Sequence, residues 1–274
     1  MSDITLGQFF PGNSFLHRLD PRTKILTAIL YMAIVFCAKH PIVYLALLLF
    51  TASIAMLGQI KLALLWKSLK PLFWVLLLTG LLNVFFTKGE SEPLLSFGII
   101  EIYKEGISRA ILMALRVMML VAGASVLLTY TTSPIRLTDG IESLLSPLRK
   151  IRMPIHEFAM MMTIALRFIP TLIEETQMIM KAQKARGADF SSGGLIQRAK
   201  ALLPILIPLF VASFQHAMDL ATAMECRCYH GGEGRTKYHV LRYKAADILA
   251  MIGMVALLGA VLLGNHYLPE GWMI

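Results

Sequence analysis

Long apolar runs separated by short charged or proline-containing segments dominate the pattern along the chain. A helix needs about 20 mostly apolar residues to cross the hydrocarbon core of a bilayer. The pattern predicts five membrane spans, at residues 25–38, 42–57, 72–86, 111–130 and 245–263. The first three runs are short, so flanking residues have to extend them. We therefore expect an all-α, polytopic membrane protein.

One further apolar stretch, residues 201–214, does not fit the pattern of a span. It has about 14 residues, it is interrupted by Pro204 and Pro208, and His216 and Asp219 follow it closely. A stretch of that length is more typical of an interfacial or protein-buried helix. We therefore predict that it does not cross the membrane.

The distribution of lysine and arginine orients the predicted spans. Three basic residues precede the first span, and Lys61, Lys67 and Lys70 follow the second. Residues 131–244 hold 15 Lys and Arg against nine Asp and Glu, and none follows Asn265. Cytoplasmic loops carry the excess of positive charge. This predicts a cytoplasmic N-terminus, an outside C-terminus, and three regions: four spans in 1–130, a cytoplasmic or interfacial region in 131–244, and the final span and tail in 245–274.

Composition supports a membrane protein and excludes several other classes. The 274 residues are 57% hydrophobic and only 16% charged, with a mean hydropathy of +0.66. A soluble domain of this size cannot bury so much apolar surface. The three cysteines give no even-numbered disulfide framework. The net charge is +9, but the 26 basic residues are interspersed with 17 acidic ones. We therefore expect contact with the bilayer and no nucleic-acid partner.

The region between the fourth and fifth spans predicts three amphipathic helices, at about 134–149, 155–186 and 195–228. The second and third would each be about 50 Å long at 1.5 Å per residue. They are too polar to be spans over that length and too apolar to stand in water. We therefore expect them to lie along the membrane face, packed on each other and on a partner.

The two long helices end in similar sequences, Lys184-Ala185-Arg186-Gly187 and Glu225-Cys226-Arg227-Cys228. An arginine at a helix end is a charged fork that can bind carboxylates of a partner bidentately. The alternative is that it only complements the helix dipole, which contributes about 0.3–1 kcal/mol. The sequence alone leaves both interpretations open.

Several segments carry a resemblance to a known family. Residues 14–24 (SFLHRLDPRTK) resemble the N-terminal signature of the transmembrane T component of energy-coupling factor (ECF) transporters. Ala185-Arg186-Gly187 resembles the first Ala-Arg-Gly motif of that family, and residues 224–229 resemble the second. Residues 231–238 are similar to the shared, vitamin-transporting type. One departure is Cys228, which stands where the family has glycine, so a left-handed conformation is less easy there.

This resemblance implies a scaffold that does no chemistry itself. Two ABC-type ATPase subunits, which bind ATP and Mg²⁺, would dock on the coupling helices, and the chain itself would hold no cofactor. Their motion would be transmitted to a substrate-binding S component, one of several interchangeable ones, for vitamin or micronutrient uptake across the cell membrane. The residues that the resemblance assigns to docking are Ala185, Arg186, Gly187, Cys226, Arg227 and Cys228.

The sequence carries little sign of catalytic or carrier chemistry. No phosphate-binding G-x-x-x-x-G-K-[ST] motif occurs, and the glycine-rich residues 231–236 lack its lysine. Cys226, Cys228 and His230 have no second ligand pair, so we expect no metal site. The alternatives of a secondary carrier or a membrane enzyme lack inverted repeats and a clustered nucleophile and base. Arg116, inside a span, could pair with a carboxylate of another span or of a partner.

Breaks in the long helices suggest where movement could occur. Prolines interrupt the helical pattern and a glycine pair separates two helices. Such positions can absorb changes of backbone angle. We therefore regard the following residues as possible hinges: Pro170, Gly193, Gly194, Pro204 and Pro208.

Overall fold

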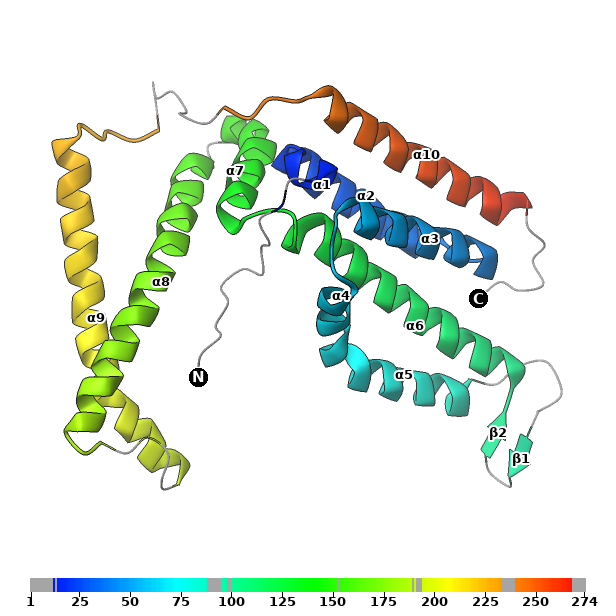
Figure 1. Cartoon of the computed structure of the whole chain (residues 1–274), viewed down its shortest axis with the longest axis horizontal. Coiled ribbons are helices and arrows are strands. Elements are labelled where there is room, and N and C mark those ends of the chain that lie inside the picture. The colour runs from blue at the N-terminus through cyan, green and yellow to red at the C-terminus, as the bar shows by residue number, and fades with distance from the viewer. Residues whose placement is uncertain are drawn as a thin grey trace. The chain divides into compact units, whose positions relative to one another are not determined.

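The computed structural model describes residues 12, 14–87, 95–97, 100–151, 153–188, 190, 194–232 and 240–267, and it is helical (Figure 1). The described helices are α1 (Phe15–Arg18), α2 (Pro21–Cys37), α3 (Pro41–Leu57), α4 (Leu62–Leu69), α5 (Phe73–Phe86), α6 (Lys104–Ala124), α7 (Pro134–Leu145), α8 (Ile155–Ala185), α9 (Leu195–Cys226) and α10 (Ala245–Tyr267). Short irregular turns extend three of them, at Lys70–Leu72, Ser125–Thr129 and Ser146–Ile151. A hairpin of three-residue antiparallel strands, β1 (Leu95–Phe97) and β2 (Ile100–Ile102), precedes α6. The predicted all-α class is confirmed.

The chain divides into two compact units. The first comprises Met1–Ser143 and Leu241–Ile274, and the second comprises Leu144–Val240. The first therefore contains α1–α6, most of α7, and α10. The second contains the two long helices α8 and α9, whose bounds agree with the predicted 155–186 and 195–228 to within two residues.

The helices of the first unit begin where the sequence supplies caps. The Asp20 side chain accepts a hydrogen bond from the Arg22 backbone N–H (3.0 Å), and Pro21 occupies the first position of α2. His40 and Pro41 do the same for α3, since His40 Nδ1 accepts from Ile42 N–H (3.3 Å). A side-chain acceptor followed by proline satisfies one free N–H and presets the backbone for a helix.

The core of the first unit forms around α2, which packs against α6 and α10. Tyr31 of α2 is fully buried, and its hydroxyl lies 2.6 Å from Thr51 Oγ1 and 3.3 Å from the Met119 carbonyl oxygen. Gly123 of α6 lies directly against the Tyr31 ring, where an added Cβ would come within 2.1 Å of the ring. The absence of a side chain at Gly123 therefore lets the two helices approach.

The set of helices able to span a membrane differs from the predicted one, although both number five. By length and composition, the described candidates are Ala63–Phe86, Lys104–Thr129, Ile155–Ala185, Ala199–Cys226 and Ala245–Tyr267. The first two predicted spans form α2 and α3, which have 17 residues each and reach only about 25 Å. By length and composition α8 and α9 also qualify as candidate spans, so their predicted place along the membrane face stays a prediction. The apolar stretch 201–214 forms part of α9, which continues to Cys226 as the predicted helix 195–228 requires.

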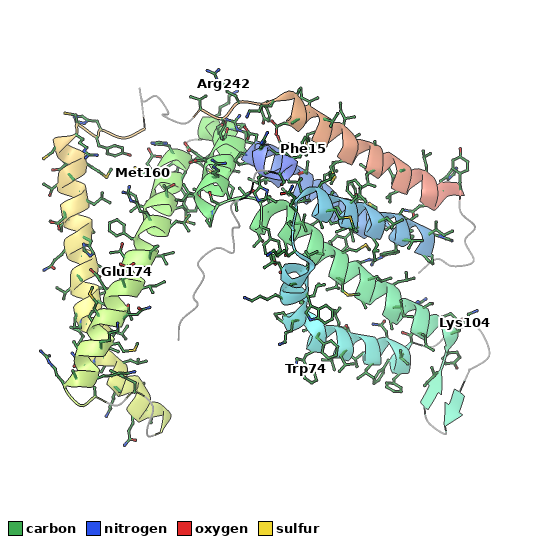
Figure 2. All side chains as sticks on the ribbon, viewed as in Figure 1. Phe15, Trp74, Lys104, Met160, Glu174 and Arg242 are labelled. Carbon is green, nitrogen blue, oxygen red and sulfur yellow. The ribbon has the colours of Figure 1, made fainter. Side chains whose placement is uncertain are left out.

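Helix α5 shows most plainly how apolar the outer surface of the first unit is. None of its 14 residues is buried, and Trp74 is 73% exposed. Figure 2 shows Trp74 pointing away from α6, which packs on the other side of α5. A helix that is apolar all round and yet unburied by protein requires an apolar solvent. The bilayer is therefore the natural surroundings of this unit.

The close approach at Gly123 gives a direct test of the core. We expect Gly123→Ala to destabilise the chain by about 1–3 kcal/mol, because the added methyl group forces Tyr31 out of place. Thermal unfolding of the purified chain in detergent measures the effect. Gly259→Ala in α10 is the matched control, since nothing lies within 4 Å of its added Cβ. Equal midpoints for the two variants would contradict the proposed packing.

Candidate functional site

Helix α8 ends in a hydrogen-bonded cap that presents Arg186 at its tip. The backbone N–H of Gly187 donates to the Lys184 carbonyl (3.0 Å), and that of Ala188 donates to the Gln183 carbonyl (3.0 Å). Gly187 has a φ of +87°. These two bonds and the left-handed residue define the Schellman ending of a helix. The helix stop predicted at Gly187 is confirmed.

Helix α9 ends in the same way, with a cysteine in the glycine position. The N–H of Cys228 donates to the Glu225 carbonyl (2.8 Å), and that of Tyr229 donates to the Met224 carbonyl (3.0 Å). Cys228 has a φ of +55°. The left-handed turn that the cysteine makes less easy is therefore formed nonetheless. Such a conformation costs a residue with a Cβ about 1–2 kcal/mol relative to glycine.

The arginines hold equivalent positions in the two endings. Arg186 and Arg227 are both the capping residue, with φ and ψ of −85° and 6° and of −94° and 17°. Both are exposed, together with Ala185, Gly187, Cys226 and Cys228. Within the described part of the chain, neither guanidinium forms an ion pair or a hydrogen bond. The donors of each guanidinium are therefore left without an acceptor in the described part of the chain.

A polar contact joins the two long helices. His216 Nε2 of α9 lies 2.6 Å from Glu175 Oε1 of α8, and the Phe168 ring lies beside the imidazole with centroids 5.9 Å apart. Next to them is a hollow of about 270 Å³, to which Ile164 of α8 and Met224 of α9 contribute. Both polar side chains are partly shielded from water, so this contact fixes how the helices pair.

The pairing places the two tips at opposite ends. Gly232, just beyond α9, lies against His156 in the first turn of α8. The Arg227 end of α9 therefore lies beside the start of α8, whereas Arg186 is at the end of that 31-residue helix. Figure 1 shows the antiparallel course of the pair. At 1.5 Å rise per residue, the two arginine-bearing ends lie about 40 Å apart.

The possible hinge residues lie in different backbone settings. Pro170 lies inside α8, and Pro204 and Pro208 lie inside α9, which bends in its first half (Figure 1). Gly194 caps α9 in an extended conformation, with φ −72° and ψ 171°, that any residue adopts. Gly193 lies outside the described residues. Hinge motion at these positions stays a prediction.

The structure gives the N-terminal signature a structural role in the first unit. Asp247, 1% exposed at the start of α10, accepts hydrogen bonds from the backbone N–H groups of Asp20 and Lys244, both at 2.7 Å. Lys24, which precedes the apolar run of α2, donates from Nζ to the Thr131 carbonyl (2.8 Å). The signature thus ties the start of α2 to α10 and to the end of α6. An acid at the start of an apolar run was the sequence signal for Asp247.

Burial changes the titration of this lysine. Desolvation and, to a smaller extent, the nearby Arg136 lower the pKa of Lys24 from 10.5 to about 8, against the opposing effect of Asp247 and Asp20. The ammonium group still carries its charge at neutral pH. Its hydrogen bond to Thr131 and the two carboxylates compensate for part of the lost hydration.

Arg116 has a different partner from the one expected. Its Nε donates to the Tyr44 hydroxyl (2.7 Å) and its Nη2 donates to the Ala38 carbonyl (3.2 Å), with the guanidinium 5.6 Å from the centre of the Tyr44 ring. The expected carboxylate is therefore replaced by a tyrosine and the carbonyl end of α2. A helix C-terminus attracts positive charge, so no acid is needed.

Comparison with known proteins agrees with these features. Residues 12–238 match the CbiQ family model, described as cobalt transport protein. The chain is 55% identical over 257 residues to the energy-coupling factor transporter transmembrane protein EcfT of Acidaminococcus fermentans, covering 94% of this chain and 95% of that protein. The proteins of the same name from Clostridium kluyveri and Bacillus subtilis are 51% identical over 252 residues (92% and 93% covered) and 46% identical over 257 residues (94% and 96% covered).

This chain belongs to the family of T components of energy-coupling factor transporters. The resemblance noted in the sequence is confirmed. The T component is a multi-pass membrane subunit of a transporter, in agreement with the apolar helices of the structure. The relatives' names describe a transmembrane component and name no cargo.

The two helix endings allow a test of the cap geometry. We expect Cys228→Gly to stabilise the α9 end by about 1 kcal/mol and Gly187→Ala to destabilise the α8 end by a similar amount, because φ is positive at both positions. Amide hydrogen exchange at Tyr229 and Ala188 reports each cap. Gly194→Ala, at a negative φ, is the control and leaves both rates unchanged. Faster exchange at Tyr229 in Cys228→Gly would contradict the argument.

The contact between α8 and α9 allows a second test. In a double-mutant cycle of Glu175→Ala and His216→Ala, we expect a coupling free energy of about 1 kcal/mol in thermal unfolding of the purified chain, since both side chains are partly exposed. The exposed neighbour Glu174 is the control, and Glu174→Ala combined with His216→Ala is expected to be additive. If the effects of Glu175→Ala and His216→Ala were additive, this contact would not be what joins the two helices.

Proposed function

We propose that the chain is the scaffold of an ATP-driven uptake transporter, on which two ABC-type ATPase subunits dock through the tips of α8 and α9. The observation that carries the proposal is the repeated ending. Arg186 and Arg227 occupy the same position in the same cap, both are exposed, and neither has an acid partner among the described residues. An arginine that only served its own helix dipole would need no such repeated geometry.

The distance between the tips supports two docking sites rather than one. A standard interface buries about 800 Å² on each partner, a patch about 30 Å across. The tips lie about 40 Å apart along α8. One interface of ordinary size therefore does not contain both arginines. Two similar grooves on two related subunits fit the duplicated ending better.

The faces of α8 and α9 suit a membrane partner as well. Four methionines on them are exposed: Met161, Met162, Met178 and Met218. Methionine is flexible and polarisable, and methionine-rich surfaces adapt to several partners. We propose that this surface receives interchangeable substrate-binding S components. The vitamin class of cargo follows from the resemblance of residues 231–238 to the shared type.

We propose the following division of labour and orientation for the chain. The chain carries out no catalysis, and ATP and Mg²⁺ bind to the partner subunits. The N-terminus is cytoplasmic and the C-terminus is outside the cell membrane, as the distribution of basic residues indicates. Helices α8 and α9 lie at the cytoplasmic membrane face, and Pro170, Gly193, Gly194, Pro204 and Pro208 let them transmit ATPase movement.

Charge reversal at the tips tests the docking. The chain is co-purified in detergent with its two candidate ATPase subunits, as native protein and as Arg186→Glu, Arg227→Glu and the double variant. We expect each single change to weaken association at least tenfold and the double change to abolish the complex, because a carboxylate repels the acidic groove that an arginine binds.

A matched control separates docking from general electrostatics. Arg167→Glu reverses an exposed charge in the middle of α8, away from both tips, and we expect it to leave the complex intact. A complex that survives the double arginine reversal would remove these residues from the interface. Equal losses in Arg167→Glu and in the single tip variants would reduce the effect to net charge and contradict docking by the tips.

A further inference from the structure

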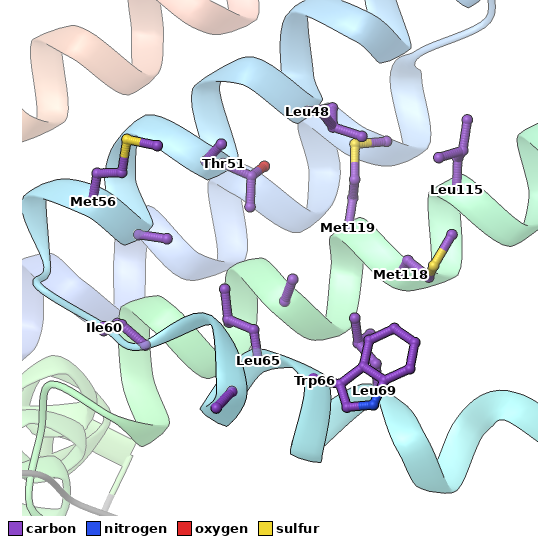
Figure 3. Close-up of a pocket in the computed structure, with 14 residues that line it drawn as sticks. Leu48, Thr51, Met56, Ile60, Leu65, Trp66, Leu69, Leu115, Met118 and Met119 are labelled. Atoms are coloured by element: carbon purple, nitrogen blue, oxygen red, sulfur yellow. The ribbon is translucent and has the colours of Figure 1, made fainter.

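The first unit contains an apolar groove that the proposed docking does not use. It has a volume of about 700 Å³ and lies between α3, α4 and α6 (Figure 3). Leu48, Met56, Trp66 and Met118 are among its lining side chains. Of the 14 lining residues, Thr51 alone has a polar side chain apart from the indole of Trp66. The groove is large enough for a small-molecule or lipid-chain ligand, for which sites of about 300–1,000 Å³ are usual.

The wall formed by α4 is held in place by hydrogen bonds. Tyr130, at the end of α6 and 1% exposed, donates from its hydroxyl to the Leu64 carbonyl of α4 (2.9 Å). The same hydroxyl shares a hydrogen bond with the Ser68 hydroxyl. These contacts fix one turn of α4 against the end of α6. The groove is therefore formed by the fold before any ligand enters.

The residues that line the groove favour an apolar ligand. The Thr51 hydroxyl donates to the Leu47 carbonyl (2.7 Å) and lies 2.6 Å from the Tyr31 hydroxyl, so its hydrogen-bonding capacity is used inside the protein. A polar ligand buried there would leave its own groups without partners, which costs free energy. A hydrocarbon chain loses nothing on entering. The groove opens among helices of a membrane protein, where acyl chains are the abundant hydrocarbon.

The α4 segment, which forms one wall of the groove, carries positive charge without counter-ions. Lys61, Lys67 and Lys70 are exposed and lie next in sequence to the lining residues Ile60, Trp66 and Leu69. Residues 21–89 contain no Asp or Glu. Among the described residues, none of the three ammonium groups has an acid within ion-pair distance. An anionic group bound along α4 would therefore meet lysines that no acid neutralises.

Taken together, these features identify a ligand with an apolar tail and an anionic head. We propose that the groove between α3, α4 and α6 binds one anionic phospholipid, with an acyl chain against Leu48, Met56 and Met118 and the phosphate at Lys61, Lys67 and Lys70. Trp66, 72% exposed at the edge, provides the aromatic ring and N–H donor that favour the boundary between headgroups and chains. The site is separate from the arginine tips and does not depend on ATPase docking.

A fluorescence experiment tests this site directly. The full chain carrying Trp74→Phe and Trp272→Phe leaves Trp66 as its only tryptophan. It is placed in nanodiscs that contain increasing fractions of phosphatidylglycerol or phosphatidylcholine with brominated chains, which quench a nearby indole. We expect phosphatidylglycerol to reach half-maximal quenching at a roughly tenfold lower fraction than phosphatidylcholine, because three lysines each favour an anionic lipid.

Further variants separate the contribution of the lipid headgroup from that of the acyl chain. Lys61→Gln, Lys67→Gln and Lys70→Gln together are expected to abolish the preference for phosphatidylglycerol, whereas Lys181→Gln, Lys184→Gln and Lys200→Gln in the second unit leave it unchanged. Ala52→Phe fills the groove and is expected to reduce quenching by both lipids. Equal quenching by the two lipids, or a preference that survives the Lys61, Lys67 and Lys70 changes, would overturn the proposal. So would loss of quenching on assembly of the transporter, which would assign the groove to a protein partner.

Discussion

The antiparallel packing of α8 on α9 is the constraint on which the functional geometry depends. Each helix ends in an arginine, so a parallel pair would bring the two arginines together at one end. The observed pair separates them by most of the length of α8, and the contact of Glu175 with His216 joins the helices between them. Whatever binds the arginines is thereby divided into two places. The proposed docking at two separate sites therefore rests on the antiparallel packing of these two helices.

The first unit handles charge in a different way from the second. Arg116, Lys24 and Asp247 are ionisable groups among apolar helices, and each is satisfied largely by backbone groups rather than by an opposite charge. A backbone carbonyl or N–H at a helix end is a fixed dipole, and it costs no side-chain ordering to use it. These residues therefore hold helix ends together. In the second unit the arginines stand on helix ends as well, but their side chains are exposed and contact no acid among the described residues.

Sequence reasoning predicted the two long helices and their ends well because the signals are local. Gly187 stops α8, basic residues gather before it, and the apolar stripe repeats with helical spacing. Length and composition alone do not decide which helices cross the membrane, because α8 and α9 qualify as candidates although they were predicted to lie along its face. Helix α9 runs through Pro204 and Pro208, as the predicted helix 195–228 requires. Lipid-exposed helices tolerate proline when neighbouring groups satisfy the freed carbonyls. Sequence reasoning could not find the partner of Arg116, because Tyr44 and the end of α2 are 72 or more residues away and carry no opposite charge.

Cys228 shows which part of the helix ending is required. The residue type differs from glycine, yet the two backbone hydrogen bonds and the positive φ are kept. The left-handed turn is unfavourable for cysteine by itself, so the surrounding contacts of the α9 end must hold it in place. The turn fixes the direction in which Arg227 leaves the helix, and a relaxed ending would let the guanidinium sample many directions. The chain keeps the geometry of the tip at the expense of local strain, which is reasonable if the geometry of the arginine, rather than the stability of the cap, is what a partner recognises.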